Sequence, residues 1–249
     1  MAPEKNPIGV PFVELQRVDS TNNYAMRLAH EGLAQHGMAV FAHEQTAGKG
    51  QRNKQWLAQP GANLMLSVII KPPAPFVQPT FLFSMAMAVA VHGLLKKFAG
   101  ASVKIKWPND LYFNDRKAGG ILIENILGSH WKFAIVGVGL NINQTEFGVL
   151  QQKAVSLKQI VGTGFDTVAL AKDLCIAIER ILKTAVTNPD AISSEYHEQL
   201  YKKNQWVTLK QGTRVFKAQI KGVNSAGQLV TAHAMEECFD VGAVEWILD

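Results

Sequence analysis

Two short polar clusters interrupt stretches that otherwise have the composition of buried strands, and their residue types suit the binding of an anion. The first cluster is Lys106-Trp107-Pro108-Asn109-Asp110, and the second is Lys117-Ala118-Gly119-Gly120, which runs on into Ile121-Leu122-Ile123-Glu124. A turn at Asn114-Asp115-Arg116 separates them. Two lysines and an aspartate beside a glycine pair indicate a site for an anionic ligand at these strand ends. The alternative is a hairpin whose exposed residues are charged, and other segments must decide between the two.

A third segment, residues 45–56, is predicted to be a loop that binds an anion. It has almost no apolar residue before Trp56, and it carries glycines at 48 and 50 and cations at 49, 52 and 54. Glycines let backbone N–H groups turn toward a ligand, and the cations supply the charge that an adenylating or phosphoryl-transfer site needs. It is not a P-loop, because the Gly-x4-Gly-Lys-Ser/Thr spacing is missing. A flexible basic surface loop is the alternative.

Two further segments place small polar residues or glycines where a ligand could bind. Asp19-Ser20-Thr21-Asn22 stands at a predicted helix start, and helix capping explains these residue types. The functional alternative is that this helix start donates hydrogen bonds to a neutral polar group such as a ureido ring. Gly137-Val138-Gly139-Leu140-Asn141 follows an apolar strand, but the third glycine and the helix of a dinucleotide-binding motif are missing. A strand-end turn and a nucleotide contact both stay open.

The composition is that of an ordinary folded chain. Of the 249 residues, 47% are hydrophobic and 18% are charged, which excludes a largely disordered protein and allows one large domain or a domain with a small appendage. The longest apolar stretch, residues 81–95, is short for a membrane span and predicts a buried helix. Because the first residues lack a signal-peptide pattern, we expect a cytoplasmic protein with no membrane partner. The net charge of +5 suits a nucleotide, a nucleic acid or an acidic protein without choosing between them.

The elements that must position these segments belong to the α+β class. Strands are predicted over residues 13–18, 38–43, 63–70, 103–107, 111–113, 120–125 and 133–138, and helices over residues 21–31, 80–98, 167–185 and 190–202. The strands between 103 and 138 follow one another without intervening helices. They therefore predict a mixed, mostly antiparallel sheet with helices packed on it, and not a doubly wound sheet.

From Trp206 onward the chain changes to short strands, predicted over residues 207–209, 214–223, 228–232 and 244–248. Their lengths and turns indicate a small β-barrel that packs on the first part of the chain. The expected domains are therefore residues 1–203 and residues 204–249.

In this order and spacing, the polar segments resemble the biotin protein ligases, the family of biotin–acetyl-CoA-carboxylase ligase and holocarboxylase synthetase. The resemblance runs from residue 13 to about 143. Residues 19–22 resemble the family's Ser-Thr-Asn segment, and residues 45–56 resemble its glycine- and arginine-rich loop. Residues 106–110 resemble its Lys-Trp-Pro-Asn-Asp signature, residues 117–124 the adjoining element, and residues 137–141 its Gly-x-Gly-x-Asn strand end. The resemblance implies a catalytic domain like that of class II synthetases over residues 1–203. It also implies an SH3-like domain over residues 204–249.

The resemblance implies a ligase that consumes ATP and forms AMP in two steps. The biotin carboxylate attacks the α-phosphorus of ATP, giving biotinyl-5′-AMP and pyrophosphate with Mg²⁺. A lysine amine of a biotin carboxyl carrier domain, such as that of acetyl-CoA carboxylase, then takes the biotinyl group. The alternative on the same fold is a lipoate or octanoyl ligase or transferase, whose Arg-Arg-x-x-Gly-Gly-Gly loop is missing here. A non-catalytic biotin-binding regulator would lack Lys117, and a nucleic-acid module would interleave aromatic and basic residues.

The resemblance also implies roles for single residues. Lys117 would stabilise the transition state, and Asp110 would engage the incoming amine or the metal, whose ligands stay unassigned. Trp56 would pack against the adenine and Asn141 would hydrogen-bond it. The expected biotin contacts are Ser20, Thr21, Asn22, Gln45, Gly48, Lys49, Gly50, Gln51, Lys117 and Gly120. The expected ATP and adenylate contacts are Lys49, Arg52, Trp56, Lys106, Asn109, Lys117 and Asn141.

The glycine loop departs from the family pattern Gly-Arg-Gly-Arg-x-Gly-Arg-x-Trp. Lys49, Gln51 and Lys54 stand at the three arginine positions, and Asn53 stands at a glycine position. Lysine keeps the charge but loses the bidentate fork of arginine, so we hypothesise that Arg52 supplies the missing guanidinium.

Two expectations concern partners of the whole molecule. Because the first predicted strand begins at residue 13, no room remains before it for a winged helix-turn-helix domain, and we expect no specific DNA binding. A homodimer that pairs through the sheet of the catalytic domain stays open.

Overall fold

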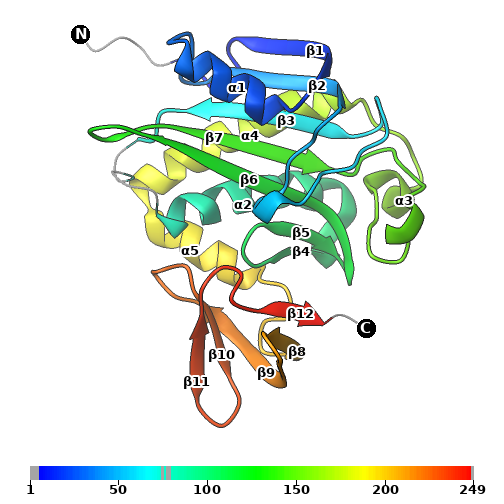
Figure 1. Ribbon diagram of the computed structural model, residues 1–249, viewed down its shortest axis with the longest axis vertical. Helices are drawn as coiled ribbons and strands as arrows, with labels where there is room; N and C mark the ends of the chain where they lie inside the picture. The colour runs from blue at the N-terminus through cyan, green and yellow to red at the C-terminus, as the bar shows by residue number, and fades with distance from the viewer. Residues whose placement is uncertain (1–5, 74–75, 77–79, 248–249) are drawn as a thin grey trace.

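A mixed seven-stranded sheet forms the larger part of the molecule (Figure 1). The computed structural model describes residues 6–73, 76 and 80–247, and within them the strand order is β1-β2-β3-β7-β6-β5-β4. The strands are β1 (Phe12–Val18), β2 (Ala39–Gln45), β3 (Leu64–Ile70), β4 (Val103–Lys106), β5 (Asp110–Phe113), β6 (Arg116–Leu127) and β7 (Trp131–Leu140). Only β1 and β2 pair in parallel among these described strands. The predicted α+β class and mostly antiparallel sheet are confirmed.

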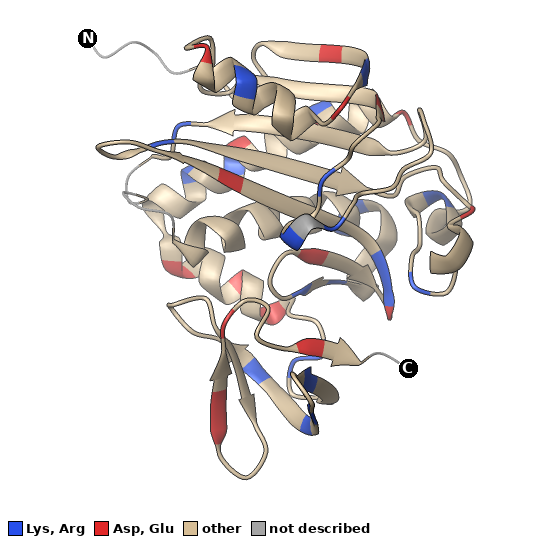
Figure 2. Ribbon diagram, viewed as in Figure 1, with Lys and Arg blue, Asp and Glu red and all other residues tan. Residues whose placement is uncertain are grey.

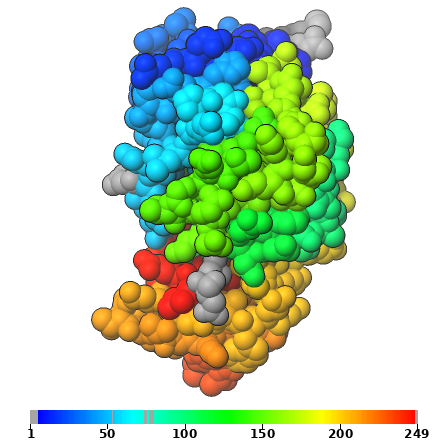
Figure 3. Space-filling model, turned by 90° about the vertical axis from the view of Figure 1, so that its right-hand side faces the viewer, coloured from blue at the N-terminus to red at the C-terminus, as the bar shows by residue number. Residues whose placement is uncertain are grey.

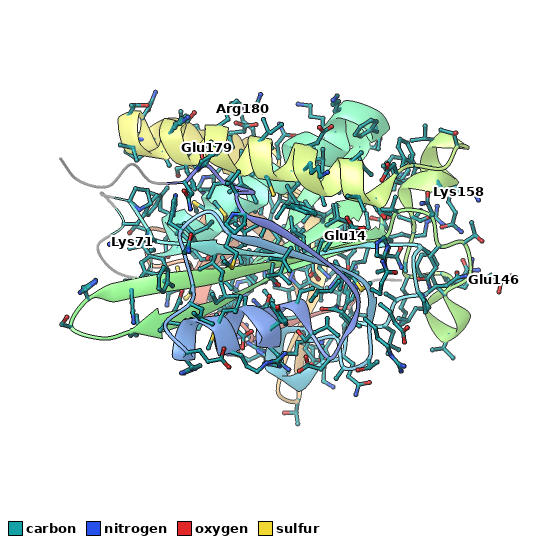
Figure 4. All side chains as sticks on the ribbon, turned by 90° about the horizontal axis from the view of Figure 1, so that it is seen from above. Glu14, Lys71, Glu146, Lys158, Glu179 and Arg180 are labelled. Carbon is teal, nitrogen blue, oxygen red and sulfur yellow. The ribbon has the colours of Figure 1, made fainter. Side chains whose placement is uncertain are left out.

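The two faces of this sheet have different coverings. Helices α2 (Phe81–Ala99), α4 (Thr167–Thr187) and α5 (Pro189–Glu198) build the main core with one face, whereas the short helix α1 (Thr21–His30) lies on the other. Figure 4, viewed from above, shows α4 with Glu179 and Arg180 on one side of the sheet and α1 on the opposite side. Helix α1 thus covers only part of its face of the sheet (Figure 1).

Helix α2 is apolar enough and long enough to cross a membrane by length and composition, but 61% of its most apolar window is buried inside the molecule. Its side chains belong to the main core between the sheet and the helices α4 and α5. His92, in the middle of α2, is fully buried, and its Nε2 lies 3.1 Å from the carbonyl oxygen of Val103. The prediction of a buried helix here is confirmed.

A second, five-stranded antiparallel sheet follows, in the order β11-β10-β9-β8-β12. Its strands are β8 (Trp206–Gln211), β9 (Arg214–Val223), β10 (Leu229–Ala232), β11 (Glu236–Phe239) and β12 (Glu245–Ile247). Figure 3 shows the red segment that carries β12 between the green part of the first sheet and the orange part of the second. The indole Nε1 of Trp107 donates to the carbonyl oxygen of Gly227 over 2.9 Å and so links the two parts. The domain boundary at residue 203 stays a prediction.

The structure differs from the prediction in several elements. Strands β6 and β7 are longer than predicted, since β6 begins at Arg116 and β7 runs to Leu140. The helix predicted to reach residue 202 ends at Glu198, because the chain there turns to pair with β4. The N–H of Tyr201 donates to the carbonyl oxygen of Ile105 (2.8 Å), and Lys202 has a positive φ of 57°. Strand β11 was missed because two of its four residues are glutamates. The five-residue helix α3 (Leu157–Val161) was also missed, although Ser156 and Gln159 form a capping box at its start. Residue 248 of the last predicted strand lies outside the described residues.

Candidate active site

A row of paired residues crosses four strands and forms the floor of the site. Lys106 on β4 is opposite Asp110 on β5, Asp110 is opposite Gly120 on β6, and Gly120 is opposite Gly139 on β7. A Cβ atom on Gly120 would lie 3.0 Å from Oδ1 of Asp110, and one on Gly139 would lie 2.6 Å from Cε2 of Trp56. The two glycines therefore give a floor without side chains, bounded by charged residues on one side and an indole on the other.

A cavity of about 570 Å³ lies over this floor, a volume typical of small-molecule sites. Most of the predicted site residues line it: Ser20, Thr21, Asn22, Gln45, Lys49, Gly50, Gln51, Arg52, Trp56, Lys106, Asn109, Asp110, Lys117 and Gly120. Segments more than a hundred residues apart in the sequence are thus brought to one place. Lysine and arginine gather along the glycine loop and at the start of β6 (Figure 2).

Lys117 and Asp110 form an ion pair inside the cavity. The Nζ of Lys117 lies 2.6 Å from Oδ1 of Asp110, and both side chains are half-buried. The backbone of Lys117 is fixed because its N–H donates to the carbonyl oxygen of Lys153 (2.8 Å) and its carbonyl oxygen accepts from the N–H of Val155 (2.9 Å). The strand ends that were predicted to bind an anion therefore carry a cation, Lys117, whose position is fixed by its backbone and by Asp110.

Two predicted contact residues do not line the cavity. Asn141 is 5% exposed, and its Nδ2 donates to the carbonyl oxygens of Lys117 (3.2 Å) and Val155 (3.3 Å). The Asn141 side chain thus fixes the backbone at Lys117. It does not reach the cavity, where it was expected to hydrogen-bond adenine. Gly48 belongs to the glycine loop, and its carbonyl oxygen accepts from the N–H of Trp56 (2.9 Å).

A buried polar network forms the end of the cavity beside α1. Gln45 Oε1 accepts from the backbone N–H of Thr21 (2.7 Å) and from its hydroxyl (3.1 Å). The hydroxyl of Ser67 lies 2.7 Å from Thr21 Oγ1 and 2.5 Å from Asn22 Oδ1. Ser20 is the N-cap residue of α1 but its side chain makes no capping hydrogen bond. The capping interpretation of this segment was therefore wrong as far as Ser20 is concerned, and its side chain faces the cavity.

Sequence reasoning missed Ser67, although a signal was present. It is a single hydroxyl residue in the otherwise apolar strand β3, and its exposed fraction is 0%. A buried polar side chain in such a strand needs a partner, and its partners here are the two residues at the start of α1.

The glycine loop closes one side of the cavity, and two of its cationic side chains contact other parts of the molecule. The Nζ of Lys49 lies 3.2 Å from Oε1 of Glu124, whose Oε2 accepts from Nδ2 of Asn22 (2.8 Å). Arg52 has a positive φ of 56°, and its Nη1 donates to the carbonyl oxygen of Gly242 over 3.0 Å. Arg52 thus lines the cavity while binding the turn that precedes β12.

Lys106 lies at the opposite wall, beside aromatic rings. Its Nζ lies 3.2 Å from the hydroxyl of Tyr112, 4.6 Å from the centre of the Tyr112 ring and 5.3 Å from the centre of the Trp246 ring. Burial lowers the pKa of Lys106 to about 8, against the opposing attraction of Asp110. The amide of Asn109 donates to the carbonyl oxygen of Ile121 and so fixes β5 against β6.

The contribution of the second sheet to this cavity was also missed. The residues concerned lie in the last turn and strand: Val241, Gly242, Val244, Glu245 and Trp246. These residues were predicted to belong to a separate small domain. Their sequence pattern does not indicate which surface of the first sheet they contact.

Comparisons with known proteins agree on the family of this chain. The model of the biotin/lipoate A/B protein ligase family matches residues 14–141. The chain is 33% identical over 175 residues to the bifunctional ligase/repressor BirA of Bacillus subtilis, covering 69% of this chain and 53% of that protein. It is 38% identical over 132 residues to the biotin–[acetyl-CoA-carboxylase] ligase of Paracoccus denitrificans, covering 52% of each. It therefore spans about half the length of these two relatives.

Among solved structures, the fold resembles that of the biotin protein ligase of Aquifex aeolicus in complex with biotin and ATP. The TM-score is 0.79 at 24% identity, and the match covers 95% of this chain and 98% of that one. This likeness supports the fold of both sheets together. Because the family model covers the segments that build the cavity from α1 to the end of β7, the chain belongs to the biotin/lipoate A/B protein ligase family.

Proposed function

We propose that this protein is a biotin protein ligase that consumes ATP, forms biotinyl-5′-AMP and transfers the biotinyl group to a lysine of a biotin carboxyl carrier domain. The proposed acceptor is the carrier domain of acetyl-CoA carboxylase, by analogy with the Paracoccus relative. The observation that carries the proposal is the position of Lys117. Its ammonium lies over a glycine floor, in a cavity that has cations around it and a neutral polar network at one end.

The charges suit the first step. A carboxylate that attacks a phosphate brings two anions together, so the site must cancel their repulsion and hold them in line. Lys49, Lys106 and Lys117 line the cavity together with Lys54, and charge that develops on the α-phosphate would be met by fixed ammonium groups. Asp110 lies in the same cavity, 2.6 Å from Lys117, and in the second step it would accept a proton from the incoming amine.

The neutral end of the cavity favours biotin over the alternative, lipoate. Ser20, Thr21, Asn22 and Gln45 line it with hydroxyl and amide groups. A ureido ring has N–H donors and a carbonyl acceptor, and can exchange hydrogen bonds with such groups. The dithiolane ring of lipoate has no N–H donor and no carbonyl acceptor, so it would gain no such hydrogen bonds at this end of the cavity.

Mg²⁺ is implied by the use of ATP, and the described residues fit a shared ion of this kind. Within them no group of three or more His, Cys, Asp or Glu side chains could form a metal site by itself. Magnesium is commonly held by one or two carboxylates together with substrate phosphates. Asp110 is a carboxylate in the cavity that could serve, and the ion would offset phosphate charge.

The test is a direct assay of both steps. The purified protein is incubated with ATP, Mg²⁺ and either biotin or lipoate, and mass spectrometry follows the acyl-adenylate and the mass of an added carrier domain. We expect biotinyl-5′-AMP and one biotinyl group on the carrier, and no gain on a carrier whose acceptor lysine is replaced by arginine. Absence of both products with biotin would overturn the proposal, and lipoyl products alone would establish the alternative.

A further inference from the structure

We propose that Trp246, on the last strand of the second sheet, is a positioning residue that holds the ammonium of Lys106 at the cavity wall for the phosphates of ATP. This inference rests on the proposed function, since it concerns the nucleotide of the first step. It assigns to the second sheet a part in nucleotide binding that acts through a lysine of the first sheet.

The geometry brings the two residues together from distant parts of the chain. Strand β12 pairs with β8, with Trp246 opposite Leu209, and this pairing carries the indole to the cavity. Lys106 stands at the end of β4, at the edge of the first sheet. Its Nζ then lies 5.3 Å from the centre of the indole ring, within the range of a cation–π interaction.

The aromatic residues around Lys106 support one another. The Tyr201 ring lies 5.1 Å from that of Tyr112 and 5.8 Å from that of Trp246. Tyr201 is itself fixed, because its hydroxyl donates to Oδ1 of Asp115 over 2.6 Å. The indole N–H of Trp246 is buried and has no hydrogen-bond partner among the described residues. The ring is therefore held by packing, and its contribution to the site comes from its face and not from its N–H.

Lys106 differs from two other cavity lysines in what holds it. Lys117 is paired with Asp110 and Lys49 with Glu124, so part of their charge is already offset by a carboxylate. Lys106 forms no ion pair within the part of the chain that the structure describes. Asp110, opposite it on β5, attracts it without an ion-pair contact, and the groups next to its ammonium are a hydroxyl and two ring faces. Such neighbours restrain the flexible lysine stem and leave its charge free for an anion. The anion that the proposed reaction brings to this cavity is the triphosphate.

The test compares Trp246→Leu with Trp246→Phe, which keeps a ring face, and with Trp206→Leu as a matched control. Trp206 is a tryptophan of the same sheet, 60% exposed and outside the cavity. We measure the KM for ATP and for biotin in adenylate formation, and the affinity of a fluorescent ATP analogue, and check folding by thermal unfolding. Trp246→Leu should raise the KM for ATP by about tenfold, from the size of a desolvated cation–π contact. Trp246→Phe should recover most of the loss, and the KM for biotin should stay within about twofold in all three variants.

A second comparison separates positioning from a general structural effect. If Trp246 acts through Lys106, then Trp246→Leu should cost little more in the presence of Lys106→Met, because coupled residues are not additive. Full additivity of the two substitutions, an equal loss in Trp206→Leu, or an equal rise in the KM for biotin would each overturn the inference. The ATP-analogue titration needs no biotin. A wild-type protein that binds the analogue but makes no biotinyl-5′-AMP would thus refute the proposed function, while the variants still decide the role of Trp246.

Discussion

The ammonium of Lys117 and the carboxylate of Asp110 lie 2.6 Å apart, on neighbouring strands, above a glycine that permits the approach. The register explains why the pair can form. A bulge between Leu111 and Tyr112 shifts the pairing of β5 and β6, so that Asp110 faces Gly120 while Lys117 pairs opposite Tyr112. Lys117 therefore reaches back over Gly120, where any side chain would come within 3.4 Å of its Nζ.

Replacement of Lys117 by methionine should lower the rate of adenylate formation by about 10²- to 10³-fold, the usual effect of removing a group that stabilises developing charge. The stem of the side chain is kept, so folding should change little. Release of pyrophosphate in a single turnover measures the step. Lys132→Met, at an exposed position on β7, is the matched control and should retain the wild-type rate. A Lys117→Met protein as fast as this control would contradict the assignment.

The order and type of the main elements could be predicted from sequence because each is a local property. The apolar run of β3 and the long apolar helix α2 have the expected composition, and the structure places them within a residue or two of prediction. The charged strand β11 and the end of α5 could not be predicted in this way. Strand β11 forms through its hairpin with β10, and α5 ends where the chain pairs with the distant strand β4. Such pairing overrides local propensity.

Much of the site could be predicted as well, because its residues stand in short motifs at strand ends. What could not be predicted is the partner of each side chain. Asn141 was expected at the adenine but donates to the carbonyl oxygen of Lys117, and Arg52 binds the carbonyl oxygen of Gly242. Neither contact has a local signal. The place of Trp246 beside Lys106 likewise follows only from how the second sheet packs on the first.

Replacement of Ser67 by alanine should weaken biotin binding more than ATP binding. The Ser67 hydroxyl joins Thr21 and Asn22 in the buried network, and its loss removes the hydrogen bond that Asn22 Oδ1 accepts. The cost of such an unsatisfied buried group is about 1–3 kcal/mol. We expect a rise in the KM for biotin of tenfold or more with little change in the KM for ATP, measured by adenylate formation. Ser129→Ala, on the exposed β6–β7 turn, is the control. Equal effects on both substrates would show that Ser67 only supports the fold.

The stability of the protein should fall as the pH is lowered from about 6.5 to about 4, in part because of His92. Burial lowers the pKa of His92 from 6.5 to about 4 in the folded protein. In that range the unfolded state binds the proton and the folded state does not, so the free energy of unfolding rises with pH until about 6.5. His92→Gln should flatten this dependence in urea titrations at several pH values. His30→Gln, at an exposed position at the end of α1, should keep the wild-type slope. An unchanged slope in His92→Gln would contradict the prediction.

The hypothesis that Arg52 supplies the guanidinium missing from the loop predicts that Arg52→Ala lowers adenylate formation much more than Gln51→Ala does. The structure shows a contact through which the position of Arg52 can be changed without replacing Arg52 itself. The Arg52 guanidinium lies against Gly242, which has a positive φ of 81°, and a Cβ atom at that position would overlap it. Gly242→Ala should therefore displace Arg52 and reproduce much of the loss seen in Arg52→Ala.

The two changes remove the same contact, so the double variant should be little worse than Arg52→Ala alone. Single-turnover formation of the adenylate by the four proteins gives the coupling, and Gly212→Ala serves as the control for strain. Gly212 also has a positive φ, of 57°, but stands in the turn between β8 and β9 with no atom near its missing side chain. Equal effects of Arg52→Ala and Gln51→Ala would refute the guanidinium hypothesis. A loss in Gly212→Ala as large as that in Gly242→Ala would instead trace the effect to backbone strain in the second sheet.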